Sequence, residues 1–212
     1  MSLNKSQMQC VLGTLIGDAS IYWKRKSSFI YSVTHCSRQK GYLEHIRKKL
    51  DAPKTFPMNP KSGFAPKGSK YFKLNFQNKG ALLPAWDIAY LDGKKTINEQ
   101  WLDLIGPEAI AYWFMDDGSS SYSTSGRYFC RFSTQSFSYS EIGLLADLLS
   151  KYGITSNPNK CSGGSGRILN IPADSSEILM NLIHPYVSSI PCMNYKLKSR
   201  ISRVIGDNNV KR

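Results

Sequence analysis

Apolar residues along the chain follow two spacings, one typical of amphipathic helices and one typical of strands with a buried face. Helical spacing predicts helices over residues 6–16, 41–50, 82–91, 107–116, 139–152 and 175–183. Strand-forming or alternating stretches predict strands over residues 20–26, 29–35, 55–58, 71–77, 119–125, 127–135, 154–160 and 167–171. The order helix, strand, strand, helix, strand, strand, helix therefore occurs twice.

Two of the predicted helices end abruptly in a carboxylate and a small residue, Asp18-Ala19 in the first half and Asp117-Gly118 in the second. The two acids are 99 residues apart, and a lysine follows each at a similar distance, 77 residues on at Lys95 and 79 residues on at Lys196. Such regular spacing indicates an internal repeat. The sequence predicts an α/β fold of the α+β type, with two pseudo-symmetric αββαββα halves over residues 1–98 and 99–212.

The net charge of +13 on 212 residues indicates a chain that binds a polyanion. Residues 1–100 hold 17 basic and 6 acidic residues, a net of +11, and residues 101–212 hold 11 and 9, a net of +2. No apolar run nears the ~20 residues of a membrane span, and the N-terminus lacks the apolar stretch of a signal peptide. Five scattered cysteines suggest neither disulfides nor a zinc site, so we expect an intracellular protein of the cytoplasm or an organelle matrix.

The two helix ends also suggest chemistry. A carboxylate at the end of a buried helix is costly to desolvate unless a positive group meets it. One such acid from each half indicates a pair brought together at a shared interface. Paired carboxylates can hold divalent cations against a phosphate.

At these residues the chain resembles the LAGLIDADG homing endonucleases, in the single-chain form that carries two motifs. Gly13 takes the place of the first motif glycine in residues 11–19, and Tyr112 stands at that place in residues 110–118. Gly17 and Asp116 are loose fits beside the acids. The resemblance covers nearly the whole chain. It implies two four-stranded antiparallel sheets that form a DNA-binding saddle, with the motif helices side by side at the domain interface.

The resemblance further implies that Asp18 and Asp117 hold a catalytic metal next to a scissile phosphate, and Asp116 competes with Asp117 for this role. The residues after the acids, Ala19 and Gly118, are expected at the same metal. The expected ion is Mg²⁺, with Mn²⁺ able to substitute and Ca²⁺ able to bind without supporting cleavage.

The family also places one lysine of each half near the cleavage site, where it polarises the phosphate or the hydrolytic water. Lys95 and Lys196 fit these positions, and Lys94 is an alternative to Lys95.

Polar rows on the predicted strands indicate how the chain contacts DNA. Lys, Arg, Asn and Gln are side chains that read base edges in the major groove. The expected DNA-binding residues are Tyr71, Lys73, Asn75 and Gln77 in one row, Arg131, Ser133 and Gln135 in another, and Tyr22, Lys24 and Lys26 beside them.

We therefore expect a monomeric, site-specific endonuclease that cuts double-stranded DNA at a long target site. The alternative is a maturase, which binds its host intron RNA and assists splicing without cutting a bond. Two acids and two basic sheets fit the endonuclease better.

Overall fold

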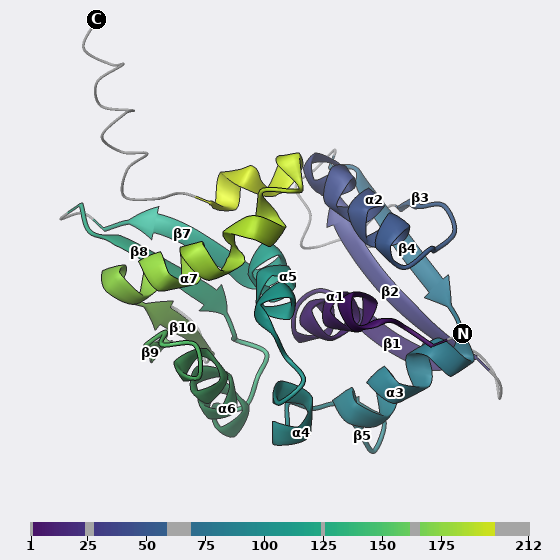
Figure 1. Ribbon diagram of the computed structural model, residues 1–212, viewed down its shortest axis with the longest axis horizontal. Helices are drawn as coiled ribbons and strands as arrows, with labels where there is room; N and C mark the ends of the chain where they lie inside the picture. The colour runs from purple at the N-terminus through teal and green to yellow at the C-terminus, as the bar shows by residue number, and fades with distance from the viewer. Residues whose placement is uncertain (1, 24–27, 59–68, 124–125, 162–165, 198–212) are drawn as a thin grey trace, which may run out of the picture.

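Each half of the chain folds into a four-stranded antiparallel sheet with helices packed against one face (Figure 1). The computed structural model describes residues 2–23, 28–58, 69–123, 126–161 and 166–197. Lys24 and Lys26, expected to bind DNA, lie outside the described residues. Over the described part of the chain, no helix has the length and apolar character needed to traverse a bilayer.

In its described residues, the first half contains three α-helices, a 3₁₀ helix and four strands, followed by a short connection. Its sheet has the strand order β1-β2-β4-β3. The elements are α1 (Lys5–Ile16), β1 (Ser20–Trp23), β2 (Phe29–Cys36), the 3₁₀ helix η2 (Ser37–Gln39), α2 (Lys40–Lys49), β3 (Phe56–Met58), β4 (Tyr71–Gln77) and α3 (Lys79–Ala89). The connection consists of β5 (Tyr90–Leu91), β6 (Lys94–Lys95) and α4 (Glu99–Leu102).

The second half repeats this order, and its sheet has the corresponding strand order β7-β8-β10-β9. The elements are α5 (Pro107–Asp117), β7 (Gly118–Tyr122), β8 (Tyr128–Ser133), α6 (Tyr139–Ser150), β9 (Asn157–Lys160), β10 (Arg167–Ile171), α7 (Ala173–Val187) and the 3₁₀ helix η3 (Pro191–Lys196). The predicted fold class is confirmed, while the division between residues 98 and 99 stays a prediction.

The repeat extends to strand register. Ser20 pairs with Ser32 in the first hairpin, and Ser119 pairs with Arg131 in the second, so both partners are displaced by 99 residues. The helices that follow, α2 and α6, also begin 99 residues apart. The equivalence of residues 99 apart therefore holds from the motif helices to the start of the next helix.

Helices α1 and α5 lie side by side at the centre of the molecule (Figure 1). Their close approach depends on Gly13, where a Cβ atom would lie 2.3 Å from the carbonyl oxygen of Ala109. Tyr112, the counterpart of Gly13 in the repeat, is 2% exposed and reaches into the other half, where its hydroxyl meets His45 Nε2 at 2.9 Å. The two halves therefore pack through α1 and α5 into one hydrophobic core, with a polar contact between Tyr112 and His45 beside it.

Among the described residues, three predicted element boundaries are wrong by three residues or more, each for a local reason. α3 begins at Lys79 rather than residue 82, because the Asn78 side chain caps the helix by accepting a hydrogen bond from the Ala81 amide. Pro84 therefore lies inside the helix rather than in its first turn. α7 continues through Pro185 to Val187, whose side chain is fully buried one turn after Ile183. The strand expected over residues 154–160 is shorter, because the chain is still in the turn that ends α6, where the amide of Ile154 donates to the carbonyl of Leu149.

Candidate active site at the ends of the motif helices

A lysine from each half, half-buried Lys95 and buried Lys196, donates hydrogen bonds to carbonyls at the end of one motif helix. Lys95 Nζ donates to the carbonyl oxygens of Gly17 and Ala19, at 3.4 and 3.1 Å. Lys196 Nζ donates to the carbonyl oxygens of Asp116 and Gly118, at 3.1 and 2.9 Å. A positive charge at a helix C-terminus is favourable because unpaired carbonyls gather there.

These contacts show which acids are equivalent in the two halves. In the first half the bonded carbonyls flank Asp18, and in the second half they flank Asp117. The repeat therefore pairs Asp117, rather than Asp116, with Asp18. Ala19 and Gly118, which the family resemblance leads us to expect at the metal, have carbonyls that accept hydrogen bonds from the lysines here.

The two lysines differ in their surroundings. Lys196 is 7% exposed and also donates to the carbonyl of Phe114 at 3.2 Å, so three carbonyls surround its ammonium group. Lys95 is half-buried and contacts two carbonyls. Burial lowers the pKa of both lysines, against nearby aspartates that raise it. Lys94, the alternative to Lys95, is exposed on β6.

Asp117 sits in a desolvated, negatively charged environment. Burial raises its pKa from 3.8 to about 7, and the charge of Asp18 adds to this effect. Lys196 and Lys95 lower the pKa of Asp117 but do not offset the increase. Asp18 is more open, with 47% of its side chain exposed. The two carboxylates thus interact in a site that lacks full compensation by positive charge.

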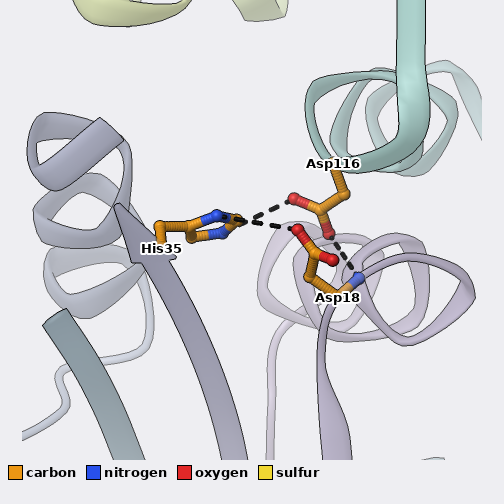
Figure 2. A group of neighbouring side chains, drawn as sticks. All are labelled: Asp18, His35 and Asp116. Carbon is orange, nitrogen blue, oxygen red and sulfur yellow. Dashed lines mark hydrogen bonds and ion pairs between the residues drawn. The ribbon is translucent and has the colours of Figure 1, made fainter. Parts of the chain in front are cut away.

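A third acid, Asp116, and a histidine, His35, lie next to Asp18. Asp116 Oδ2 accepts a hydrogen bond from the backbone amide of Asp18 at 3.1 Å, and Asp116 Oδ1 accepts one from the Tyr42 hydroxyl at 2.9 Å. His35 lies between the acids, with Nδ1 3.7 Å from Asp18 Oδ2 and Nε2 3.6 Å from Asp116 Oδ1 (Figure 2). Ligand atoms of Asp18, His35 and Asp116 all lie within 4.8 Å of one another, as in groups that can hold a metal.

Burial disfavours charge on both Asp116 and His35. Burial raises the pKa of Asp116 well above 3.8, and Asp18 raises it further, while the hydrogen bonds from Asp18 and Tyr42 oppose the increase. Burial also lowers the pKa of His35, although the charge of Asp18 acts in the other direction.

Sequence reasoning missed the position of His35 beside Asp18 and Asp116. Residues 29, 31 and 33 of β2 face the core, and the same alternation points His35 inward. A polar residue at a core-facing position of a strand was the available signal.

The outer face of the first sheet carries the predicted polar row of β4. Lys73 and Asn75 pair with Thr34 and Ser32 of β2, which places these four residues on one face. Tyr71 is half-buried, Gln77 is exposed, and Tyr22 of β1, which is 38% exposed, lies on the same face. The row therefore has the predicted orientation.

In the second half, a groove connects Asp117 to the outer face of the sheet. Asp117 lines this groove, and so do all three residues predicted to read bases from β8 and the turn after it, Arg131, Ser133 and Gln135. Arg131 and Ser133 are exposed on β8, and Gln135 is exposed just beyond it. The sequence analysis missed Asn170, which pairs with Arg131 and so shares its face.

The fold and this site together define a class of protein: two αββαββα halves whose central helices bring one acid each to a common interface. A family model described as "LAGLIDADG DNA endonuclease family" matches residues 8–179. The chain belongs to this family.

Curated proteins named as a maturase and as an endonuclease are among those similar to this chain. The "Cytochrome b mRNA maturase bI2" of Debaryomyces hansenii is 27% identical over 206 residues, which cover 92% of this chain and 74% of that protein. The "Probable intron-encoded endonuclease 1" of Wickerhamomyces canadensis is 28% identical over 211 residues, covering 92% of this chain and 85% of that protein. The maturase of the same name from Saccharomyces cerevisiae is matched over 48% of its length, so this chain spans about half of it.

A solved structure shares the whole architecture. The homing endonuclease I-WcaI bound to its DNA recognition sequence superposes with a TM-score of 0.82 at 24% sequence identity. The match covers 94% of this chain and 88% of that chain. At this identity the likeness shows a common fold.

Proposed function

We propose that this chain is a monomeric, metal-dependent endonuclease that cuts both strands of double-stranded DNA at a specific site. The observation that carries this function is the arrangement of Asp18 and Asp117. They come from equivalent helix ends of the two halves and interact with one another, and Asp117 lines the groove beside the polar face of the second sheet.

The donor set fits a hard divalent cation such as Mg²⁺. Asp18 offers an accessible carboxylate, and Asp117 offers one whose pKa is raised because burial and a neighbouring negative charge disfavour its ionised form. A divalent cation would relieve this electrostatic cost. When bound, such an ion lowers the pKa of a water molecule and neutralises charge on the phosphate.

The lysines supply the remaining positive charge. Lys196 holds its helix end through three carbonyls, which leaves it suited to position Asp117. Lys95 donates to two carbonyls, and an ammonium group carries three N–H donors. We assign the third N–H of Lys95 to a phosphate oxygen or to the hydrolytic water.

The sheets supply specificity. A two-stranded β-ribbon fits the major groove of B-form DNA, where Lys, Arg, Asn and Gln distinguish base pairs. Lys73, Asn75 and Gln77 of one half and Arg131 and Ser133 of the other occupy outer sheet faces suited to this contact. The groove beside Asp117 would place base recognition next to the cut.

The test is cleavage of a pool of randomised duplexes with Mg²⁺, alongside binding measured with Ca²⁺. Asp18→Asn and Asp117→Asn should each abolish double-strand cleavage, because each removes a carboxylate from one centre. DNA affinity should be largely retained, since the sheet contacts remain.

Asp103→Asn is the matched control. Asp103 is an exposed acid that pairs with Lys151 at 2.7 Å, beside the loop that precedes α5 and away from the acidic pair. This variant should cut DNA as the wild type does. Undiminished double-strand cutting by either active-site variant would remove that aspartate from the mechanism.

A maturase is the second candidate function, favoured by the relative from Debaryomyces hansenii that carries this name. A maturase would bind the RNA of its host intron more tightly than any DNA, and its splicing activity should survive loss of both acids. A-form RNA has a deep, narrow major groove that side chains do not read, so its binding would use other contacts. Competition between selected DNA duplexes and intron RNA at matched salt separates the two functions.

A further inference from the structure

The repeat is broken beside the acids, where Gly17 is the counterpart of Asp116. A Cβ atom at Gly17 would lie 2.5 Å from both Cβ and Oδ2 of Asp116. The missing side chain at Gly17 therefore makes room for the carboxylate of Asp116. In that space the carboxylate accepts the hydrogen bond from the Asp18 amide. An acid on the second motif helix thus contacts the backbone that carries the acid of the first.

Asp116 is itself held in place. Its side chain has no exposed surface, and His35 has 2% of its side chain exposed. Tyr42, fully buried on α2, donates to the second carboxylate oxygen. Because a buried polar group without partners costs ~1–3 kcal/mol, these contacts favour a single position for the carboxylate.

No equivalent support surrounds Asp117 among the described residues. The repeat places Thr134 at the position of His35, but its hydroxyl donates to the carbonyl of Arg167 at 2.8 Å. It places Glu141 at the position of Tyr42, but that carboxylate accepts from Ser138 and from the backbone amide of Ile97. Both counterparts are therefore engaged elsewhere, and the two acids have different surroundings.

We propose that Asp116 is a positioning residue for Asp18 alone, so that the two centres, and the DNA strands they cut, are inequivalent. The inference rests on the proposed endonuclease function. Misplacing a reacting group by about 1 Å can cost ~100-fold in rate. Loss of Asp116 should therefore slow one strand much more than the other.

The experiment follows each strand separately, with a different label on each strand of the selected duplex, in single-turnover cleavage with Mg²⁺. Asp18→Asn first identifies the strand that depends on Asp18, because that strand stays intact. Asp116→Ala should slow the same strand by about 10-fold or more and accumulate a nicked duplex. Asp116→Asn keeps one oxygen acceptor and should lose less.

Two further variants separate positioning from general destabilisation. Tyr42→Phe removes a donor to Asp116 and should bias cleavage against the same strand. Ser176→Ala removes a buried hydroxyl that bonds the Cys130 amide and the Ile171 carbonyl, away from the acids. It should lower stability without changing the ratio of the two strand rates.

Amide hydrogen exchange of the metal-free protein supplies a readout that needs no cleavage. In Asp116→Ala the amide of Asp18 should lose protection, whereas that of Ala19, which bonds the Thr14 carbonyl at 2.9 Å, should keep it. Unchanged protection at Asp18, or equal slowing of both strands, would overturn the inference. A wild type that cuts neither strand would instead refute the proposed function, and the exchange result would still decide the role of Asp116.

Discussion

Replacing Asp117 with Asn should stabilise the metal-free protein at neutral and alkaline pH. The carboxylate is desolvated and repelled by Asp18, so ionising it costs free energy in the folded state. Asn has a similar shape and no charge. A residue retained for metal binding at the expense of stability is expected at a functional site.

The raised pKa sets the sign and the pH range. The unfolded chain releases the Asp117 proton near 3.8, while the folded chain holds it until about pH 7. Between these values the folded state binds more protons, so stability falls as pH rises and levels off above about 7. The difference of about 3 units corresponds to at most ~4 kcal/mol. The variant should equal the wild type near pH 4 and exceed it by up to this amount at pH 8.5.

Urea unfolding with a chelator present, at several pH values between 4.5 and 8.5, measures this difference. Asp116 and His35 also titrate, but both remain in the variant, so subtracting the two curves isolates most of the Asp117 contribution. Asp103→Asn, an exposed acid replaced in the same way, loses only a surface ion pair with Lys151 and should show no gain in stability at alkaline pH. Added Ca²⁺ should reverse the order at pH 8.5, because the wild type alone keeps both carboxylates.

The reasoning fails if the two unfolding curves coincide at every pH. It fails equally if the advantage of the variant grows toward acidic pH, because that would mean a depressed pKa for Asp117. A gain that survives saturating Ca²⁺ would show that the carboxylate does not take part in metal binding.

Two further predictions concern packing and recognition. Gly13→Ala should lower the free energy of unfolding in urea by about 1–3 kcal/mol, because its Cβ would overlap the Ala109 carbonyl. Gly143→Ala in α6, where a Cβ meets nothing within 4 Å, should raise it by about 0.5–1 kcal/mol, and the opposite order would refute the packing argument. Arg131→Ala should weaken discrimination between bases at particular positions of the target by about 1–3 kcal/mol, as measured by selection and binding experiments. An equal loss of affinity for all sequences would instead mean that Arg131 contacts phosphate.

The fold could be predicted because its main signals are periodic and local. Alternation identified β4 at its full length, and helical spacing identified α5 and α6 to within two residues. Short elements gave no such signal. The β5–β6 hairpin has two residues in each strand, and α4 has four residues, too few for either period to develop.

The candidate site likewise has residues that the sequence predicts and residues that depend on contacts between distant segments. The acids, the lysines and the β8 row follow from spacing, because a repeat places equivalent residues at equivalent points. Asp116 could be named only as a competitor of Asp117. Its inward position depends on the absence of a side chain at Gly17, which belongs to another helix. His35 joins the group through the pairing of β2 with its neighbours, a contact between segments far apart in sequence.

Positions where the two halves differ, such as Gly17 and Asp116, therefore indicate how the two acids differ in their surroundings. Gly17 and Asp116 occupy equivalent positions, each directly before the acid of its half. If both were aspartate, two carboxylates would have to be buried between the helix ends, and if both were glycine, none would be. A Gly17–Asp116 pair allows the helices to stay close and lets one carboxylate use the space that the other position leaves. A pseudo-symmetric target would favour identical halves, whereas one chain with two different halves can support Asp18 and Asp117 differently. The difference between Gly17 and Asp116, which makes both residues loose fits to the motif, is thus the physical basis for expecting the two strands to be cut at different rates.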